Sequence, residues 1–236
     1  MGKQFRFFLL ISLAFFLFQP SLLIAQDSTA LKPSQPVLKN AIALLPQYAL
    51  YRGIRVDIER RLKSEDHWLV FAHQFYLDVE NSTYYYNEGD YGNYESMFGV
   101  GLNIYFKTIV FKSRKINAVS GLPRQSIYLQ AGPNFQYFNL QNEEEVAKPF
   151  TDVNGTTYFQ FNLETVNKPI YRFGAVADFG WQLAFDRFLL DLYLGMGIKY
   201  SLDGEGNLIK DSNTQWVRPT FSGILLDGGL RFGLFF

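Results

Sequence analysis

The stretch from Pro219 to Phe236 constrains the fold of this chain more than any other. Counting back by twos from Phe236, one register carries Leu234, Phe232, Leu230, Gly228, Leu226 and Ile224. The other register carries Phe235, Gly233, Arg231, Gly229, Asp227 and Leu225. Successive side chains of a β-strand point to opposite faces, so the stretch predicts a strand with one apolar face and one face of Gly, Arg and Asp.

The same alternation recurs along the chain and predicts seven earlier strands. They are a short first strand within Lys39–Tyr51 that turns near Arg52, followed by 54–62, 68–79, 98–107, 127–137, 171–185 and 188–200. Pro133 falls inside the fifth strand, where a proline is tolerated only at a bulge or kink. With the closing strand, the sequence predicts an all-β protein of eight strands.

The longest expected connection is Asn142–Pro169, and it contains a further alternating segment. Phe159, Phe161 and Leu163 alternate with polar residues there, and Asn154-Gly155 is a strong signal for a tight turn. A full strand at this point would require another strand elsewhere to keep the number even, and no segment supplies one. We therefore expect a hairpin beyond the barrel. The remaining connections are expected at 63–66, 80–96, 108–124, 186–187 and 201–218.

The amino-terminal segment has the features of a cleaved secretory signal. Lys3 and Arg6 precede an apolar run over 7–18, and Ala25 is a small residue before Gln26. The run is shorter than the roughly 20 residues that a membrane-spanning helix needs. We expect a signal peptide over 1–25, a polar lead-in over 26–37 and a barrel over 38–236. A retained membrane anchor is the alternative.

The composition removes several classes of function. The 236 residues carry no formal net charge, so nothing suggests nucleic acid or an acidic substrate as a partner. The absence of cysteine excludes a disulfide framework, a thiolate metal site and a cysteine nucleophile. The sequence indicates no cofactor and no metal.

The residues of the polar face distinguish a membrane barrel from a soluble barrel. A soluble barrel would present Lys, Glu, Asp and Thr to water, whereas here Gly, Asn, Gln, Tyr and single charges dominate that face. The large apolar residues of the other face would overfill a lumen of eight strands, but they suit lipid. Aromatic residues are expected near the strand ends, as at membrane interfaces, namely Tyr137, Tyr171, Trp181, Phe185, Phe188 and Tyr200. The expected fold is a transmembrane, antiparallel, up-and-down β-barrel.

The terminal strand, the secretion signal and the repeated alternation together resemble small Gram-negative outer-membrane β-barrels of the OmpA, OmpX and OmpW type. The resemblance implies short turns on the periplasmic side, long outer loops and location in the cell outer membrane. It also implies contact with outer-membrane lipid and lipopolysaccharide, and handling by periplasmic chaperones and the barrel-assembly machinery. In that family the machinery reads the terminal pattern, which here consists of Phe236, Leu234, Phe232 and Leu230.

Charged residues on the inward faces predict a closed lumen. The positive set is Arg55, Lys107, Arg172, Lys199 and Arg231, and the negative set is Asp57, Glu59, Asp178, Asp191 and Asp227. An eight-stranded lumen is just wide enough for side chains to fill, and an unpaired charge there is costly. We therefore expect a salt-bridged plug; an ion path lined by the same residues is the alternative.

An enzymatic role would require a nucleophile and a base, and the sequence marks out no such pair. His67 lies beside a turn, and neither His67 nor His73 is followed two residues later by serine, as in outer-membrane lipid A deacylases. The leading hypothesis is a non-enzymatic barrel whose outer loops serve interaction with an unidentified surface ligand or envelope integrity. The alternatives are a narrow pore or channel for small hydrophobic compounds and, third, a lipid A-modifying enzyme.

Overall fold

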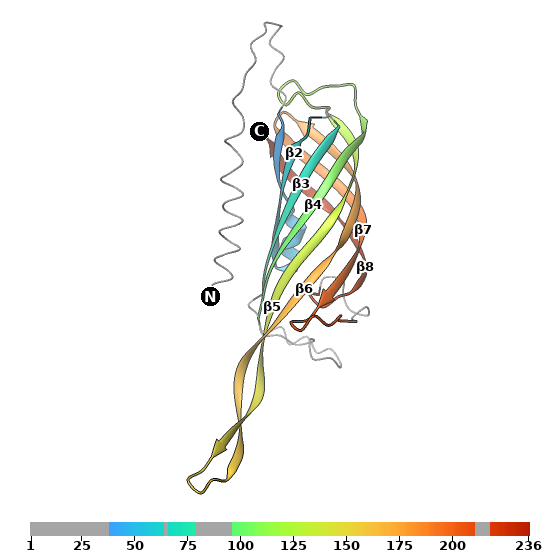
Figure 1. Cartoon of the computed structure of the whole chain (residues 1–236). Coiled ribbons are helices and arrows are strands. Elements are labelled where there is room, and N and C mark those ends of the chain that lie inside the picture. Colours follow the sequence, from blue (N-terminus) through green and yellow to red (C-terminus); the bar gives the residue numbers. More distant parts are fainter. Residues whose placement is uncertain (1–37, 64–65, 79–95, 211–217) are drawn as a thin grey trace. The chain divides into compact units, whose positions relative to one another are not determined.

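Eight antiparallel strands form a closed barrel (Figure 1). The computed structural model describes residues 38–63, 66–78, 96–210 and 218–236. The elements are β1 (Asn40–Leu44), η2 (Pro46–Tyr51), β2 (Gly53–Arg61), β3 (His67–Asp78), β4 (Ser96–Lys112), β5 (Gln125–Thr151), β6 (Thr157–Phe185), β7 (Phe188–Leu202) and β8 (Gly223–Phe235). Each strand pairs with its sequence neighbours, and β1 pairs with β8 to close the ring. The predicted all-β, up-and-down barrel of eight strands is confirmed.

Several sequence expectations concern other parts of the chain. The signal peptide over 1–25, the lead-in over 26–37 and most of the tyrosine-rich connection over 80–96 lie outside the described residues.

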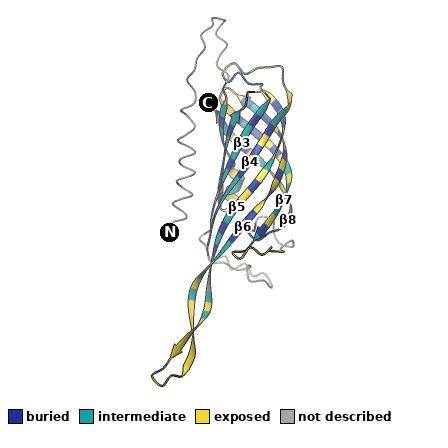
Figure 2. Cartoon of the chain, in the orientation of Figure 1, coloured by how far each residue is buried: buried dark blue, intermediate teal, exposed yellow. Residues whose placement is uncertain are grey.

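Side chains alternate between the lumen and the outer surface along the strands (Figure 2). In β7, Asp191 and Tyr193 are buried, whereas Leu192 and Leu194 are exposed. In β3, the predicted shared face of Leu69, Phe71, His73, Phe75 and Leu77 alternates with the buried Trp68, Val70, Ala72, Gln74 and Tyr76. The predicted faces of these strands are therefore confirmed.

The first strand is short, as predicted. β1 ends at Leu44, and Pro46–Tyr51 forms a 3₁₀ helix between the strand and the predicted turn. Pro46 lacks an N–H for a strand ladder but suits the first turn of a helix. The chain does reverse where predicted, because Arg52 takes a left-handed conformation with φ 53°. Within the described residues, no helix is long and apolar enough to cross a membrane.

The connection expected over Thr108–Arg124 is also shorter. β4 continues to Lys112 through an irregularity between Ile109 and Phe111, and β5 begins at Gln125. The register shift lets Phe111 pair with Ile127, so the apolar outer face extends further than the predicted strand. The remaining segment, 113–124, folds against the barrel end, where Leu122 is buried.

β5 and β6 extend beyond their neighbours as one continuous hairpin. Their ladder runs from Gln125 opposite Leu183 to Thr151 opposite Thr157, and the turn has Gly155 at φ 80°. The alternating segment at Phe159 therefore belongs to this hairpin and adds no further strand to the ring, as predicted. Figure 1 shows the hairpin as the long ribbon of β5 and β6.

Pro133 lies where β5 loses part of its pairing with β4. It faces Ala175 of β6, but the ladder with β4 is interrupted at Gly132 and Pro133. A Cβ added at Gly132 would lie 1.8 Å from the carbonyl oxygen of Ile104, so the backbones approach too closely there for any other residue. The interruption agrees with the expectation that Pro133 needs an irregular site.

Candidate functional site

The outer surface of the barrel is apolar. Leu192, Leu194, Leu226 and Ile224 are exposed there by 51%, 68%, 64% and 75%. The inward positions of the same strands hold charged and polar groups that are buried. A closed barrel with apolar residues outside and polar residues inside has no unpaired sheet edge and fits hydrocarbon rather than water, so this is a transmembrane barrel.

Aromatic side chains gather on the outer surface toward both ends of the strands. Trp181, Phe185 and Phe188 are exposed near the β6–β7 turn, and Phe185 and Phe188 are directly paired. Toward the other end, the rings of Tyr137 and Tyr171 lie 5.4 Å apart. These positions are where membrane-interface aromatic residues are expected.

Arg231 of β8 lies at the centre of the lumen and faces carboxylates from three other strands. Its guanidinium lies 3.5 Å from Asp57, 3.7 Å from Glu59, 3.8 Å from Asp178 and 3.6 Å from Asp191. These separations exceed ordinary hydrogen-bond lengths, so the attraction is mainly Coulombic. The Arg231 side chain is fully buried, and its guanidinium carbon lies 4.3 Å from the centre of the Tyr193 ring.

Lys107 of β4 links the same carboxylates to a second part of the lumen. Its Nζ donates to Glu59 Oε2 at 2.8 Å and to Gln182 Oε1 at 2.6 Å, and it lies 3.9 Å from Asp191. Tyr128 donates its hydroxyl to Asp191 at 2.8 Å, and its ring lies under the Lys107 ammonium at 4.2 Å. These groups connect β2, β4, β5, β6 and β7 through the lumen.

Arg55 of β2 forms the next ion pair along the lumen. Its Nε and Nη2 donate to the two oxygens of Asp57 at 2.7 and 3.1 Å, and Nη1 lies 3.7 Å from Asp227. Nη1 also donates to the hydroxyl of Tyr48, which η2 carries into the barrel. η2 therefore adds a polar side chain to the lumen where β1 has already ended.

The structure brings eight of the ten predicted lumen charges together and places the other two apart. Arg172 donates to Gln136 at 2.7 Å and to the carbonyl of Arg218 at 2.7 Å, and it lies over the ring of Phe138 at 4.8 Å. Lys199 lies on the inward face of β7 and is half-buried. Within the described ranges, neither Arg172 nor Lys199 has a carboxylate within 4.0 Å.

Uncharged side chains complete the network, and the charge count alone did not identify them. Gln130 donates to Asp178 at 2.7 Å, Asn134 bonds Asn103, and Gln136 bonds Gln74. The inward register of β5 contains three of these residues, so strand periodicity was the signal that could have found them. Their partners on other strands were not available from periodicity.

A cluster of buried apolar side chains lies toward each end of the lumen. One cluster contains Trp68, Leu122, Ala184, Leu189 and Phe235, together with the small Ala41 and Ala43. The other contains Tyr76, Met97, Phe138, Leu140 and Ile170, with Tyr48 and Ile209 packed against it. The charged middle of the lumen therefore lies between two apolar layers.

The two histidines lie apart from the lumen charges. His73 is on the outward face of β3, and His67 places Nδ1 3.3 Å from the hydroxyl of Thr108. The His67 ring lies 5.2 Å from Phe106. Among the described side chains, no group of three His, Asp or Glu residues is arranged to hold a metal ion.

The four predicted assembly-signal residues all point outward. Phe236, Leu234, Phe232 and Leu230 are exposed by 58%, 46%, 50% and 42%. Phe232 pairs with Leu44 of β1 and Leu190 of β7, so the terminal strand sits in the closed wall with its apolar face outward.

No model of a known protein family and no curated protein matches this chain. The structure is similar to the N-terminal β-barrel domain of Pseudomonas aeruginosa OprF, with a TM-score of 0.38 and 13% identity, over 85% of this chain and 98% of that chain. It is also similar to Acinetobacter baumannii CarO, with a TM-score of 0.39 and 11% identity, over 86% of this chain and 99% of that chain. The closed ladder of eight strands itself establishes the fold.

Proposed function

We propose that this protein is a non-enzymatic outer-membrane barrel with a closed lumen, which acts through the hairpin and connections at one end. The observation that carries the proposal is the network of buried lumen charges, in which Arg231 faces four carboxylates. A hydrated ion needs a continuous polar path, and the buried apolar clusters toward the two ends support a lumen without one. The lumen side chains thus stabilise the barrel, and the hairpin and connections outside the membrane carry out the function.

The β5–β6 hairpin provides the surface for interaction. On one face of its outer part, Phe159, Phe161 and Leu163 are exposed by 66%, 66% and 67%. They lie opposite Pro149, Ala147 and Glu145 across the ladder. Exposed apolar side chains grouped in this way mark sites of interaction.

The other face of the hairpin combines ion pairs with two exposed rings. Lys148 pairs with Glu164, and Lys168 pairs with Glu144 at 2.5 Å. These pairs are partly exposed, so each contributes little to stability. Phe150 and Tyr158 lie opposite each other at the tip of this face. Among the described side chains, the apolar residues of the first face are therefore the ones that no ion pairs accompany.

Location in the outer membrane is part of the proposal. The apolar outer surface, the secretion signal expected over 1–25 and the terminal pattern ending at Phe236 all support it. The partners in assembly would be periplasmic chaperones and the barrel-assembly machinery, and the surrounding molecules would be outer-membrane lipid and lipopolysaccharide. The hairpin would meet an unidentified ligand outside the cell.

Single-channel recording in planar lipid bilayers tests the closed lumen. We expect the purified, refolded protein to insert without producing steady current steps. Persistent, uniform steps would refute the plug and favour the narrow-pore alternative. Insertion is checked in the same samples by protease protection, so that a silent bilayer cannot result from failure to insert.

The role of the hairpin is tested separately by proximity labelling on intact cells. Replacing Phe159, Phe161 and Leu163 by serine removes this apolar face and changes no residue of the barrel wall. We expect this variant to lose labelled partners that the original protein captures. Lys148→Gln, on the opposite face, is the matched control and should keep the labelled partners. An unchanged partner set in the serine variant would show that the apolar face is not used.

A further inference from the structure

Six exposed basic residues surround the barrel end at which β8 finishes. We call them the basic collar: Lys63, Lys112, Arg114, Lys115, Arg124 and Arg187. Lys112 ends β4, and the other five lie in the β2–β3, β4–β5 and β6–β7 connections. The described side-chain carboxylates in the same connections are Asp66 and Asp186. Basic side chains therefore outnumber acidic ones among the described residues here, although the whole chain carries no net charge.

The collar lies where the apolar outer surface ends. Phe111 is exposed by 60% and is followed directly by Lys112. Phe188 is exposed by 64% and follows directly after Arg187. In each case a lipid-facing aromatic ring adjoins a cation, which is the order expected at the boundary between hydrocarbon and headgroups. The collar is thus at the height of the phosphate groups of the nearby leaflet.

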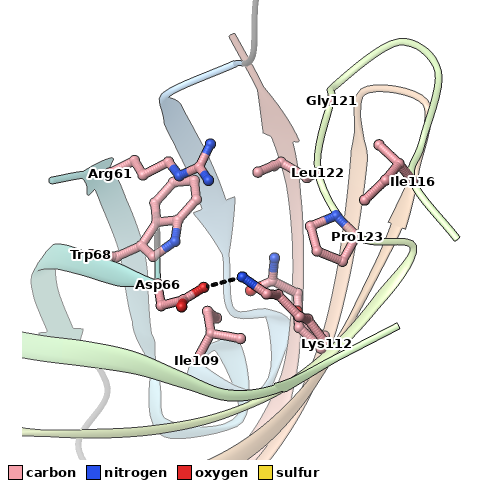
Figure 3. Close-up of a pocket in the computed structure, with 11 residues that line it drawn as sticks. Arg61, Asp66, Trp68, Ile109, Lys112, Ile116, Gly121, Leu122 and Pro123 are labelled. Carbon is pink, nitrogen blue, oxygen red and sulfur yellow. Dashed lines mark hydrogen bonds and ion pairs between the residues drawn. The ribbon is translucent and has the colours of Figure 1, made fainter. Parts of the chain in front are cut away.

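A pocket of about 250 Å³ opens beside the collar (Figure 3). Trp68, Ile109 and Leu122 supply apolar lining, while Arg61 and Lys112 supply positive charge. Figure 3 shows the ion pair of Lys112 with Asp66, at 2.8 Å. Both side chains are nearly half exposed, and an exposed pair of this kind is weak. Lys112 can therefore exchange Asp66 for a phosphate at little cost.

We infer that the basic collar binds the headgroups of anionic glycerophospholipids in the leaflet at this end of the barrel. Lysine and arginine close to a membrane surface attract anionic lipid, and several together act additively. Because the collar adjoins lipid-facing rings such as Phe111 and Phe188, a headgroup held there keeps its acyl chains in the surrounding leaflet. This preference is a property of the membrane-spanning barrel and does not depend on what the hairpin binds.

The test measures which lipids associate with the barrel. The full protein is reconstituted in phosphatidylcholine vesicles, and electron spin resonance of spin-labelled lipids gives the association constant of phosphatidylglycerol relative to phosphatidylcholine. We expect a preference of several-fold for phosphatidylglycerol. The variant Lys112→Gln/Lys115→Gln/Arg124→Gln should lose most of it. The matched variant Lys148→Gln/Lys168→Gln/Lys210→Gln, which removes as many lysine or arginine charges away from the collar, should retain it.

Two outcomes would overturn the inference. Equal association of the two lipids would show that the collar does not select anionic headgroups, and an undiminished preference in the collar variant would place the selection elsewhere. A third arm adds inorganic phosphate and, separately, sodium chloride at the same ionic strength. If phosphate abolishes the preference and chloride does not, the collar recognises the phosphate group of the lipid, which supports the inference. The retained fold of each variant is checked by its heat-dependent mobility in gels.

Discussion

Replacing Arg231 by methionine tests whether the lumen network holds the barrel together. Methionine is unbranched and apolar and replaces the stem of arginine, but it removes the cation that four carboxylates share. The remaining cations of this cluster are then Arg55, which is committed to Asp57, and Lys107, which is bound to Glu59. Asp178 would keep its hydrogen bond from Gln130 but lose the guanidinium beside it.

The expected loss follows from the distances around Arg231. At the 3.6 Å separation of Arg231 from Asp191, a pair of unit charges attracts by about 4 to 5 kcal/mol at an effective dielectric constant of 20. Desolvation of each ion costs several kcal/mol and offsets much of the summed attraction. Removing one partner leaves the others buried without compensation, so we expect Arg231→Met to lower the free energy of unfolding by about 3 to 5 kcal/mol.

Urea titration in phospholipid vesicles, followed by tryptophan fluorescence, measures this loss. Arg114→Met is the matched control, because Arg114 is exposed, and should change the free energy of unfolding by about 0.5 kcal/mol or less. In Arg231→Met/Asp178→Asn the unfolding free energy should recover in part, since one uncompensated charge is removed. If the unfolding free energy of Arg231→Met lies within about 1 kcal/mol of that of the original protein, the carboxylates do not depend on Arg231 and the electrostatic reasoning is wrong.

Three further outcomes follow from other parts of the barrel. Gly132→Ala would place a methyl group 1.8 Å from a carbonyl oxygen of β4, so we expect it to lower the free energy of unfolding in urea by about 1 to 3 kcal/mol or more. The control Gly228→Ala, whose nearest contacts are 3.2 Å away, should lower it by less. Equal losses in the two variants would contradict the close approach at Gly132. Phe236→Ala should reduce the folded protein recovered from outer membranes several-fold while leaving refolding in vitro unchanged; unchanged recovery would mean that Phe236 is not part of the assembly signal. Hydrogen bonding from the backbone N–H of Asn207 lowers the pKa of the exposed Asp203 carboxyl. The stabilisation of this turn should therefore be fully present above pH 3.8, the ordinary pKa of an aspartate, and be lost as pH falls through the lowered pKa. An acid titration of the Asn207 amide followed by NMR measures the midpoint. A midpoint at or above 3.8 would contradict the lowered pKa of Asp203.

The faces of the strands could be predicted from the sequence because lipid imposes a simple demand. Every second residue of β7 and β8 must be apolar where it meets hydrocarbon, and the rest are free to be polar. Leu192 and Leu194 on one side and Asp191 and Tyr193 on the other satisfy that demand without exception. The even number of strands could then be inferred from the need to close the ring.

β1 could not be predicted equally well, because its inward residues are small rather than polar. Ala41 and Ala43 are buried at the apolar end cluster, so their alternation with Ile42 and Leu44 gave little contrast. Pro46 was the informative residue, since it ends the ladder and begins η2. The 3₁₀ helix then places Tyr48 in the lumen, where no strand pattern would have placed it.

The pairing of lumen side chains depends on the stagger of the strands, which cannot be read from the periodicity of the sequence. Lys107 and Glu59 belong to β4 and β2, and Lys107 and Gln182 belong to β4 and β6, so these contacts join strands that are not neighbours. Which inward residues meet across a barrel depends on the stagger of all the strands together. The sequence therefore specifies which charges enter the lumen, while the closed ring decides which of them pair. Arg172 shows the consequence, because its partners are an amide and a carbonyl rather than a predicted carboxylate.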